Sequence, residues 1–288
     1  MPLPAGPLVG TCGFGYPEWR GRFYPPELAP GDWLGFYGRV FEAVELDGTF
    51  YRPPEAGQVA VWADALPDRF AVAAKAPRAI THEARLEGEA AAGMLRAFAR
   101  ALEPFGDRLL AVVLQLPPSL DAGEGRERLA RLLDTRPGGL PIVVEVRHRS
   151  WDEAWLPELL EAGGAGLVLA DRPRFTGAPL WGSPDPSGDE LWPAPSGPVG
   201  YVRLLGDRPA TPVIGRAVRN RSADLDRWAR LLAEAGPRSG RRPPAAFANN
   251  RFEGAAFDTA AALRRRLGQP VTEPRDLWPA PPLPGLEP

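Results

Sequence analysis

The chain has 288 residues, 44% of them hydrophobic, and a formal net charge of −2. This length and apolar content suit one large α/β domain or two smaller ones with sizeable cores. The near-zero charge argues against a bulk electrostatic attraction to nucleic acid or to an anionic membrane.

Cysteine content and the N-terminal residues bear on location. The single cysteine, Cys12, excludes an intrachain disulfide and fits a reducing compartment. Residues 1–10 contain neither a basic region nor a long apolar run. No stretch reaches the roughly 18 apolar residues typical of a membrane span. We therefore expect a cytoplasmic protein with no membrane partner.

Short, nearly continuous apolar runs recur along the chain, and many are rich in β-branched residues. Such runs are typical of parallel strands that are buried on both faces. The predicted strands cover residues 7–12, 43–51, 70–75, 109–116, 141–148, 165–171, 199–205 and 245–250.

Amphipathic stretches with helical spacing lie between these runs. The predicted helices cover residues 32–41, 58–66, 89–102, 125–133, 152–162, 223–235 and 254–267. The sixth crossover, residues 172–198, is rich in Pro, Gly and Trp, so we expect it to be irregular and without a helix.

Eight strands that alternate with helices, except at the sixth crossover, predict a single (β/α)₈ TIM-type barrel over residues 1–268. Residues 269–288 form a proline-rich C-terminal tail that we expect on the surface or disordered. The alternative is a doubly wound open sheet, which needs a glycine-rich phosphate-binding turn after the first strand. Residues 10–15 match that turn only in part.

Polar residues interrupt or end most of the predicted strands near their carboxyl ends, where barrel active sites lie. A charge in an apolar run costs several kcal/mol unless it is paired, so these residues need an explanation. Acids and bases nearly balance, and a structural ion-pair network closing the barrel is the alternative explanation. The residues are Glu45, Asp47, Lys75, Gln115, Glu145, Arg147, His148, Asp171, Arg203, Asn249 and Asn250.

Lys75 is the only lysine among 34 lysines and arginines. A solvated surface charge accepts either residue, whereas a site that needs a compact ammonium or a titratable amine does not. Two roles stay open for Lys75: an electrostatic anchor for a phosphate or carboxylate, or a Schiff-base nucleophile.

Short motifs mark the ends of the predicted strands. They are Gly10-Thr11-Cys12-Gly13, Thr49-Phe50-Tyr51-Arg52, Lys75-Ala76-Pro77-Arg78, Thr81-His82, Glu145-Val146-Arg147-His148, Tyr201-Val202-Arg203-Leu204 and Asn249-Asn250. In this order they resemble the motifs of the YecE-like family, domain of unknown function 72. The resemblance runs from about Gly10 to Leu267 and implies a TIM-type barrel without implying an activity. Asp47 and Leu205 depart from the family pattern.

The strand-end residues predict an enzyme, of an acid–base hydrolase or lyase type, that acts on a small polar or anionic substrate. The candidate catalytic residues are Glu145 as acid or base, Glu45 and Lys75. The candidate binding residues are Asp47, Tyr51, His82, Gln115, Arg147, His148, Asp171, Arg203, Asn249 and Asn250.

No cofactor is expected to be required, and no zinc site is expected from one cysteine and two histidines. A divalent cation such as Mg²⁺ could be held by Glu145 and Asp171. A retaining glycosidase is disfavoured because the fourth and seventh strands carry Gln115 and Arg203 instead of carboxyls. Cys12 is expected to face the helices as an inert core residue.

Two further features leave alternatives open. Trp19, Trp181 and Trp192 are loop candidates for stacking on a ligand. Arginines at 208, 216, 219 and 221 could bind phosphate or nucleic acid, although a solvated loop explains them as well.

A non-catalytic small-molecule-binding protein and a nucleic-acid-processing hydrolase are the alternatives to the enzyme. The sequence does not indicate the oligomeric state.

Overall fold

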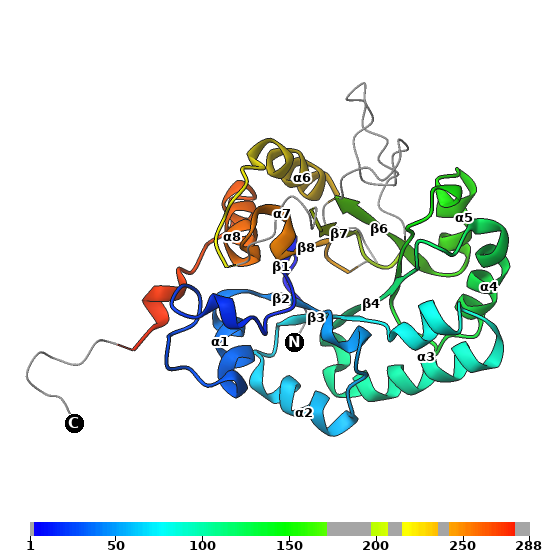
Figure 1. Cartoon of the computed structure of the whole chain (residues 1–288), viewed down its shortest axis with the longest axis horizontal. Helices are drawn as coiled ribbons and strands as arrows, with labels where there is room; N and C mark the ends of the chain where they lie inside the picture. The colour runs from blue at the N-terminus through cyan, green and yellow to red at the C-terminus, as the bar shows by residue number, and fades with distance from the viewer. Residues whose placement is uncertain (1–2, 172–196, 207–214, 236–241, 280–288) are drawn as a thin grey trace, which may run out of the picture.

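A computed structural model of the chain shows a closed barrel of eight parallel strands with helices outside it (Figure 1). The structure describes residues 3–171, 197–206, 215–235 and 242–279. The strands follow one another around the barrel in chain order. They are β1 (Leu8–Cys12), β2 (Ala43–Leu46), β3 (Ala71–Lys75), β4 (Leu109–Gln115), β5 (Ile142–Glu145), β6 (Ala165–Asp171), β7 (Tyr201–Leu204) and β8 (Ala245–Ala248).

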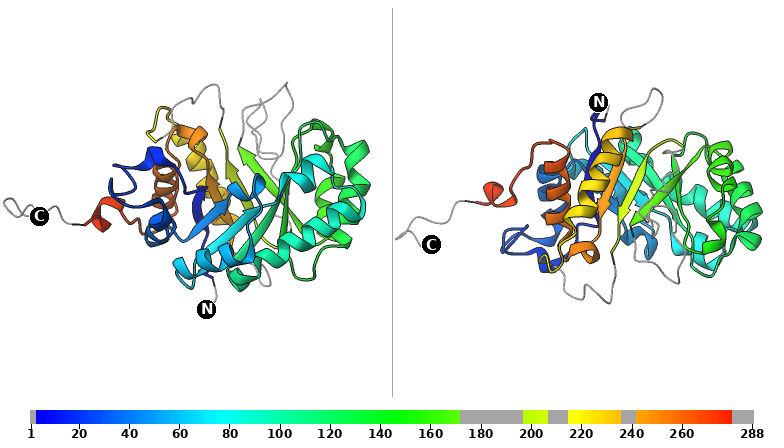
Figure 2. Two further views of the ribbon diagram at one scale, coloured as in Figure 1. Left: turned by 60° about the horizontal axis from the view of Figure 1, so that its bottom comes forward. Right: turned by 90° about the horizontal axis from the view of Figure 1, so that it is seen from above.

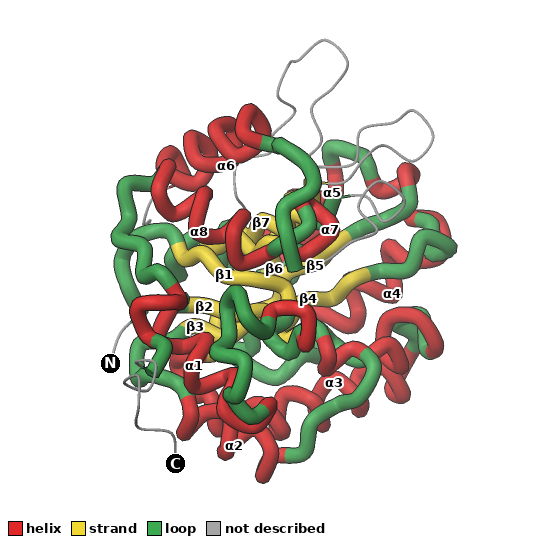
Figure 3. Tube along the Cα trace, turned by 60° about the vertical axis from the view of Figure 1, so that its left-hand side comes forward, coloured by secondary structure: helices red, strands yellow, loops and turns green. Residues whose placement is uncertain are grey.

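The helices surround the strands, as the red helices around the yellow strands in Figure 3 show. They are α1 (Trp33–Val40), α2 (Ala56–Ala65), α3 (Gly88–Leu102), α4 (Ala122–Asp134), α5 (Trp155–Ala162), α6 (Ser222–Ala235), α7 (Asn250–Glu253) and α8 (Ala256–Arg266). The predicted TIM-type fold is therefore confirmed. Residues 172–196 of the irregular sixth crossover lie outside the described residues.

Small side chains fill much of the barrel interior and let two aromatic rings fit there. Ala43, Ala73 and Ala245 lie in the interior cluster with Tyr201 and Phe247, whose ring centroids are 5.1 Å apart. Because all eight strands are parallel, their carboxyl ends lie at the same end of the barrel (Figure 2). That end is where the polar residues gather.

The main apolar core lies between the strands and the helices. On α3, for example, Ala91, Leu95 and Phe98 are buried at helical spacing, which fixes this helix against the barrel wall. Within the described residues, none of the helices is both long enough and apolar enough to cross a membrane.

The prediction for the orientation of Cys12 is wrong. Its side chain lies in the barrel interior with Ala43 and Phe247, and its Sγ is 3.6 Å from the carbonyl oxygen of Phe247. Thr11 is the residue that faces the helices, because its hydroxyl lies 2.9 Å from the hydroxyl of Tyr37 on α1. Burial raises the pKa of the Cys12 thiol well above its usual range, so the expected inert role stands.

The first part of the C-terminal tail lies against the barrel. Gln269 donates to the carbonyl oxygen of Pro7 (2.6 Å), and Trp278 donates to that of Phe23 (3.2 Å) after the short helix η7 (Pro274–Leu277). Residues 280–288 lie outside the described residues.

Candidate functional site

Four polar side chains from four strands meet inside the barrel at the carboxyl ends of the strands. Glu45 on β2, Gln115 on β4, Glu145 on β5 and Arg203 on β7 are all buried. Each occupies the same face of its strand as interior residues two positions earlier, such as Ala43 before Glu45 and Tyr201 before Arg203. Strand alternation therefore aims all four inward.

Arg203 is the centre of this group. One terminal nitrogen, Nη2, donates to Oε1 of Glu45 at 2.7 Å. The other, Nη1, donates to Oε2 of Glu145 and lies 3.3 Å from Oε1 of Gln115. A planar guanidinium presents its N–H donors in a rigid fork, which suits it to bridging two carboxylates at fixed positions.

The remaining carboxylate oxygens are also occupied. Oε2 of Glu45 accepts a 2.8 Å hydrogen bond from the Tyr201 hydroxyl, and Oε1 of Glu145 accepts a 2.7 Å bond from Nε of Arg147. Each of these four oxygens thus has a donor, which offsets the cost of burying the two carboxylates. The ion-pair network that was the alternative explanation for these charges is present at this layer of the barrel.

Lys75 lies beside this network without joining it. Its side chain is only 8% exposed, and Nζ is 3.7 Å from the centroid of the Phe50 ring. Within the described part of the chain, Nζ makes no hydrogen bond and no ion pair. Burial, with the nearby charge of Arg203, lowers the pKa of Lys75 to about 8.

Residues next to Lys75 in space fix its position. The Thr49 hydroxyl lies 2.6 Å from the carbonyl oxygen of Lys75 and 2.7 Å from that of Leu46, which ties the ends of β2 and β3 together. Thr49 and Phe50 belong to the short helix η3 (Gly48–Phe50), so the same turn brings the Phe50 ring to the amine.

His82 and Arg147 complete the surroundings of Lys75. The His82 ring packs edge-on against Phe50, with centroids 4.9 Å apart, and its Nδ1 is 2.8 Å from the Thr81 hydroxyl. Burial, together with the charges of Lys75 and Arg147, lowers the pKa of His82 to about 4. Both cations therefore lie close to a neutral imidazole ring at pH 7.

Asp47 and Tyr51 border the same region from the end of β2. Burial and the charge of Glu45 raise the pKa of Asp47, while Arg203 and Lys75 oppose the rise. Tyr51 is 72% exposed and packs edge-on against Phe50. The structure thus brings Tyr51 and His82 together around Phe50, next to Lys75. The Asp47 carboxylate lies beside Gly13, just after β1.

Asp171 does not lie in this group. Its carboxylate accepts bonds from Nη2 of Arg221 (2.8 Å) and from Nε1 of Trp228 on α6 (2.7 Å). On β6 the interior residue is Val168, so Asp171 has the opposite parity and points outward. Glu145 and Asp171 are therefore on different faces of the barrel wall, and this geometry does not support the predicted Mg²⁺ site between them.

Three other predicted binding residues cap local structure. His148 precedes the short helix η6 (Arg149–Trp151), and its Nδ1 is 2.8 Å from the Ser150 hydroxyl. Asn249 caps α7 by accepting from the backbone nitrogen of Arg251 at 2.9 Å. Asn250 accepts from Nε1 of Trp19 (3.1 Å) and from the backbone of Ala256 (2.9 Å).

The predicted stacking and basic-loop residues fall largely elsewhere. Trp19 is fully buried among Phe23, Tyr24 and Phe257, so it belongs to the core and not to a ligand surface. Trp181, Trp192 and Arg208 lie outside the described residues. In the basic loop, Arg221 pairs with Asp171 and Asp224.

Sequence reasoning missed three contributors to the site: Phe50, Thr49 and Tyr201. Tyr201 could have been found, because it shares the parity of Arg203 on a strand of only four residues. Phe50 carried no such signal, since an aromatic residue in an apolar run is ordinarily core.

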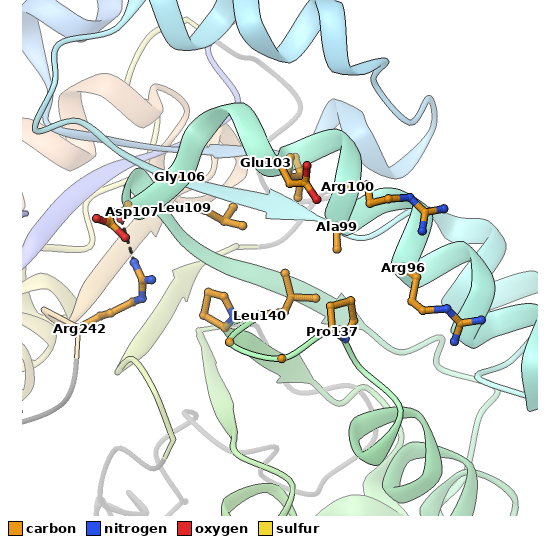
Figure 4. A pocket seen from close by; sticks show the side chains of 14 residues that line it. Arg96, Ala99, Arg100, Glu103, Gly106, Asp107, Leu109, Pro137, Leu140 and Arg242 are labelled. Atoms are coloured by element: carbon orange, nitrogen blue, oxygen red, sulfur yellow. Dashed lines mark hydrogen bonds between the residues drawn. The ribbon is translucent and has the colours of Figure 1, made fainter.

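Two cavities of the described structure lie away from this site. One, of about 480 Å³, is lined by Leu109, Pro141 and Arg242, which lie where β4, β5 and β8 begin, at the opposite end of the barrel (Figure 4). The other, of about 530 Å³, lies between α1, α8 and the segment around Pro274. Among the described residues, no three His, Cys, Asp or Glu side chains are grouped so that they could hold a metal ion.

Comparisons with known proteins agree with this architecture. The chain is 30% identical over 147 residues to UPF0759 protein YunF of Bacillus subtilis strain 168, covering 50% of this chain and 51% of YunF. It is 30% identical over 172 residues to UPF0759 protein YecE of Escherichia coli K12, covering 57% of this chain and 61% of YecE. The alignments thus span about half to three fifths of the length of these relatives.

Solved structures share the fold. A DUF72 family protein of Thermotoga maritima MSB8 (TM1631) matches with a TM-score of 0.72 at 24% identity, over 92% of this chain and 100% of that one. Another, from Enterococcus faecalis V583 (EF0366), matches with a TM-score of 0.71 at 18% identity, over 92% of this chain and 96% of that one. The model of the family described as "Protein of unknown function DUF72" matches residues 8–284. The chain therefore belongs to the DUF72 family, as the resemblance of its motifs implied.

Proposed function

We propose that the carboxyl ends of the strands bind a small molecule that carries a phosphate or carboxylate group, and that the chain is an enzyme acting on it. The observation that carries this proposal is the Lys75 ammonium, which is nearly buried and makes no hydrogen bond or ion pair within the described residues. A buried charge without a partner costs several kcal/mol, so its presence is explained best by an anionic ligand.

Arg147 supplies the second contact in this proposal. Its Nε is bound to Glu145, whereas its terminal nitrogens make no hydrogen bond or ion pair in the described part of the chain. The charges of Arg147 and Lys75 both act on the His82 ring, which packs against the same Phe50 ring as the Lys75 amine. Two cations and a neutral imidazole suit a phosphate or carboxylate group.

The occupied carboxylates change the expected acid–base assignment. Both oxygens of Glu45 and of Glu145 already accept hydrogen bonds, three of the four from arginine. We assign these two residues to holding Arg203 and Arg147. Asp47, with its raised pKa and no ion pair among the described residues, is the better candidate to move a proton.

Two further points belong to the proposal. The occupied carboxylates also favour non-catalytic binding as a second candidate, because they leave fewer groups free for chemistry. The single buried cysteine supports a reducing, cytoplasmic location.

The test is a thermal-shift screen of inorganic phosphate, sugar phosphates and small organic acids against wild type and Lys75→Arg. We expect wild type to be stabilised and the variant to bind at least about tenfold more weakly with an unchanged unliganded Tm, since the two cations are not interchangeable. Equal affinity in the variant, or no anion that stabilises wild type, would contradict the proposal. Consumption of a screened metabolite that Lys75→Arg and Asp47→Asn abolish identifies the enzyme, and binding without consumption identifies a binding protein.

A further inference from the structure

We propose that Lys75 is a covalent site, whose ε-amine forms an imine with a 2-oxo acid while Arg147 holds the carboxylate of that acid. The inference rests on the proposed function and names its substrate class. It makes Lys75 a nucleophile as well as a contact for the ligand.

The geometry leaves the amine available for attack. An ε-amine that is tied to a carboxylate cannot present its lone pair, and the Lys75 amine has no such tie within the described residues. The Phe50 ring covers one side of the amine at 3.7 Å, and Thr49 fixes the backbone beneath it. The side chain is thus held in place without its nitrogen being occupied.

The electrostatic surroundings favour the neutral amine. Arg203 on β7 and Arg147 after β5 lower the pKa of Lys75, while Glu145 and Glu45 raise it, and burial brings it to about 8. The neutral His82 ring of η4 (Ala79–Glu83) adds no counter-charge near pH 7. With a pKa of about 8, about a tenth of the amine is neutral at pH 7, against less than about one part in a thousand for an ordinary lysine.

The reaction needs no other reactant. The lone pair of neutral Nζ forms the C–N bond as the carbonyl π electrons move to oxygen, which takes up a proton. The nitrogen then forms the C=N bond as the C–O bond breaks, and the oxygen leaves as water. Both hydrogens of that water come, in net, from the amine.

Arg147 selects the acid among carbonyl compounds. Its terminal nitrogens are unoccupied within the described residues, and a planar guanidinium binds a carboxylate through two parallel hydrogen bonds. Its Nε is bound to Glu145, and the charges of both residues act on Lys75. A carbonyl carbon adjacent to a carboxylate would therefore meet both of them.

The experiment uses the fact that the chain contains one lysine. The folded protein is treated with glyoxylate and sodium cyanoborohydride, and the carboxymethyl group left on each amine is quantified by peptide mass mapping. The N-terminal amine is the internal reference, and the urea-unfolded chain reports the intrinsic reactivity of Lys75. We expect Lys75 to react at least about tenfold faster in the folded protein than in urea.

Propanal, an aldehyde without a carboxylate, and the variant Arg147→Gln test the role of the guanidinium. Glyoxylate should react faster than propanal at Lys75 in wild type, and Arg147→Gln should abolish the preference. Modification confined to the N-terminal amine, slower reaction of Lys75 in the folded state, or an unchanged preference in Arg147→Gln would overturn the inference.

Glycolate, the alcohol that corresponds to glyoxylate, separates this inference from the proposed function. It carries the carboxylate but cannot form an imine. Stabilisation by glycolate that is lost in Lys75→Arg, without trapping of glyoxylate, would overturn the covalent role and leave anion binding standing. Absence of both effects would overturn both.

Discussion

The ammonium of Lys75 faces the ring of Phe50 at 3.7 Å from its centroid, and it makes no hydrogen bond or ion pair within the described residues. A cation–π contact contributes about 0.5 to 2 kcal/mol, which is less than the cost of burying an unpaired charge. Lys75 therefore destabilises the folded protein, and this energetic cost is the reason to assign it a ligand.

Replacing Lys75 by Met should stabilise the unliganded protein at pH 7. The pKa of about 8, against an ordinary value of 10.5, corresponds to a penalty on the order of 1 to 3 kcal/mol once the lost contact with Phe50 is allowed for. Urea unfolding of wild type and Lys75→Met at pH 7 measures the difference. A variant less stable than wild type would show that the ammonium stabilises the fold.

The difference in stability between wild type and Lys75→Met should change with pH in a defined direction. Between about pH 8 and pH 10.5 the unfolded chain holds the Lys75 proton more tightly than the folded protein does. Wild type should therefore gain stability from this group as pH rises through that window, and Lys75→Met should lack the gain. The advantage of the variant should thus shrink towards pH 10.5, and an advantage independent of pH would contradict the assignment.

Arg203→Met should be strongly destabilising, by about 3 to 5 kcal/mol, because it leaves two buried carboxylates without their shared partner. Adding Glu45→Gln should recover part of this loss, since it removes one of the two buried carboxylate charges left without Arg203. Denaturant unfolding of the single and double variants measures both effects. A loss below about 1 kcal/mol, or no recovery, would show that Arg203 does not hold the network together.

Asp171→Asn should lower stability by about 2 kcal/mol, because the carboxylate accepts bonds from Arg221 and Trp228. Asp226→Asn is the matched control, since its exposed pair with Arg266 should contribute less than about 1 kcal/mol. Neither variant should change the stabilisation by anions found in the screen. If Asp171→Asn were no longer stabilised by anions while the unliganded protein kept its stability, Asp171 would have to be assigned to the binding site.

His82 should remain neutral well below the usual histidine range. Folding lowers its pKa to about 4, so the unfolded chain binds the proton more tightly between about pH 6.5 and pH 4, and this stabilising contribution is lost as pH falls through that window. A chemical-shift titration of the ring, with His82→Asn to assign its signals against those of His148, measures the value. A midpoint near 6.5 would show that the ring is neither buried nor surrounded by cations as described.

Much of the site could be predicted because a charge inside an apolar strand is conspicuous. Glu45, Gln115, Glu145 and Arg203 interrupt or end apolar runs, and the barrel fold then places those strand ends together. The direction in which a side chain points was harder to predict. Both faces of a parallel barrel strand are apolar, so nothing in the run Ala165–Asp171 shows that Asp171 points away from the interior.

The same ambiguity explains the wrong orientation of Cys12, whose strand Leu8–Cys12 is buried on both faces. His148 and Asn249 mark a different limit. Residues that follow a strand often satisfy nearby backbone groups, and a sequence does not distinguish such a cap from a ligand contact. Whether Lys75 forms an ion pair depends on the positions of carboxylates from other strands, which only the folded arrangement defines.

The most direct test of the role of Lys75 is to titrate its amine. Reductive ¹³C-methylation labels one lysine and the N-terminal amine, and the signal that Lys75→Arg lacks belongs to Lys75. The account predicts an apparent pKa near 8 that rises when inorganic phosphate is added, because an anion stabilises the ammonium. An ordinary pKa near 10.5 that does not respond to phosphate would contradict it.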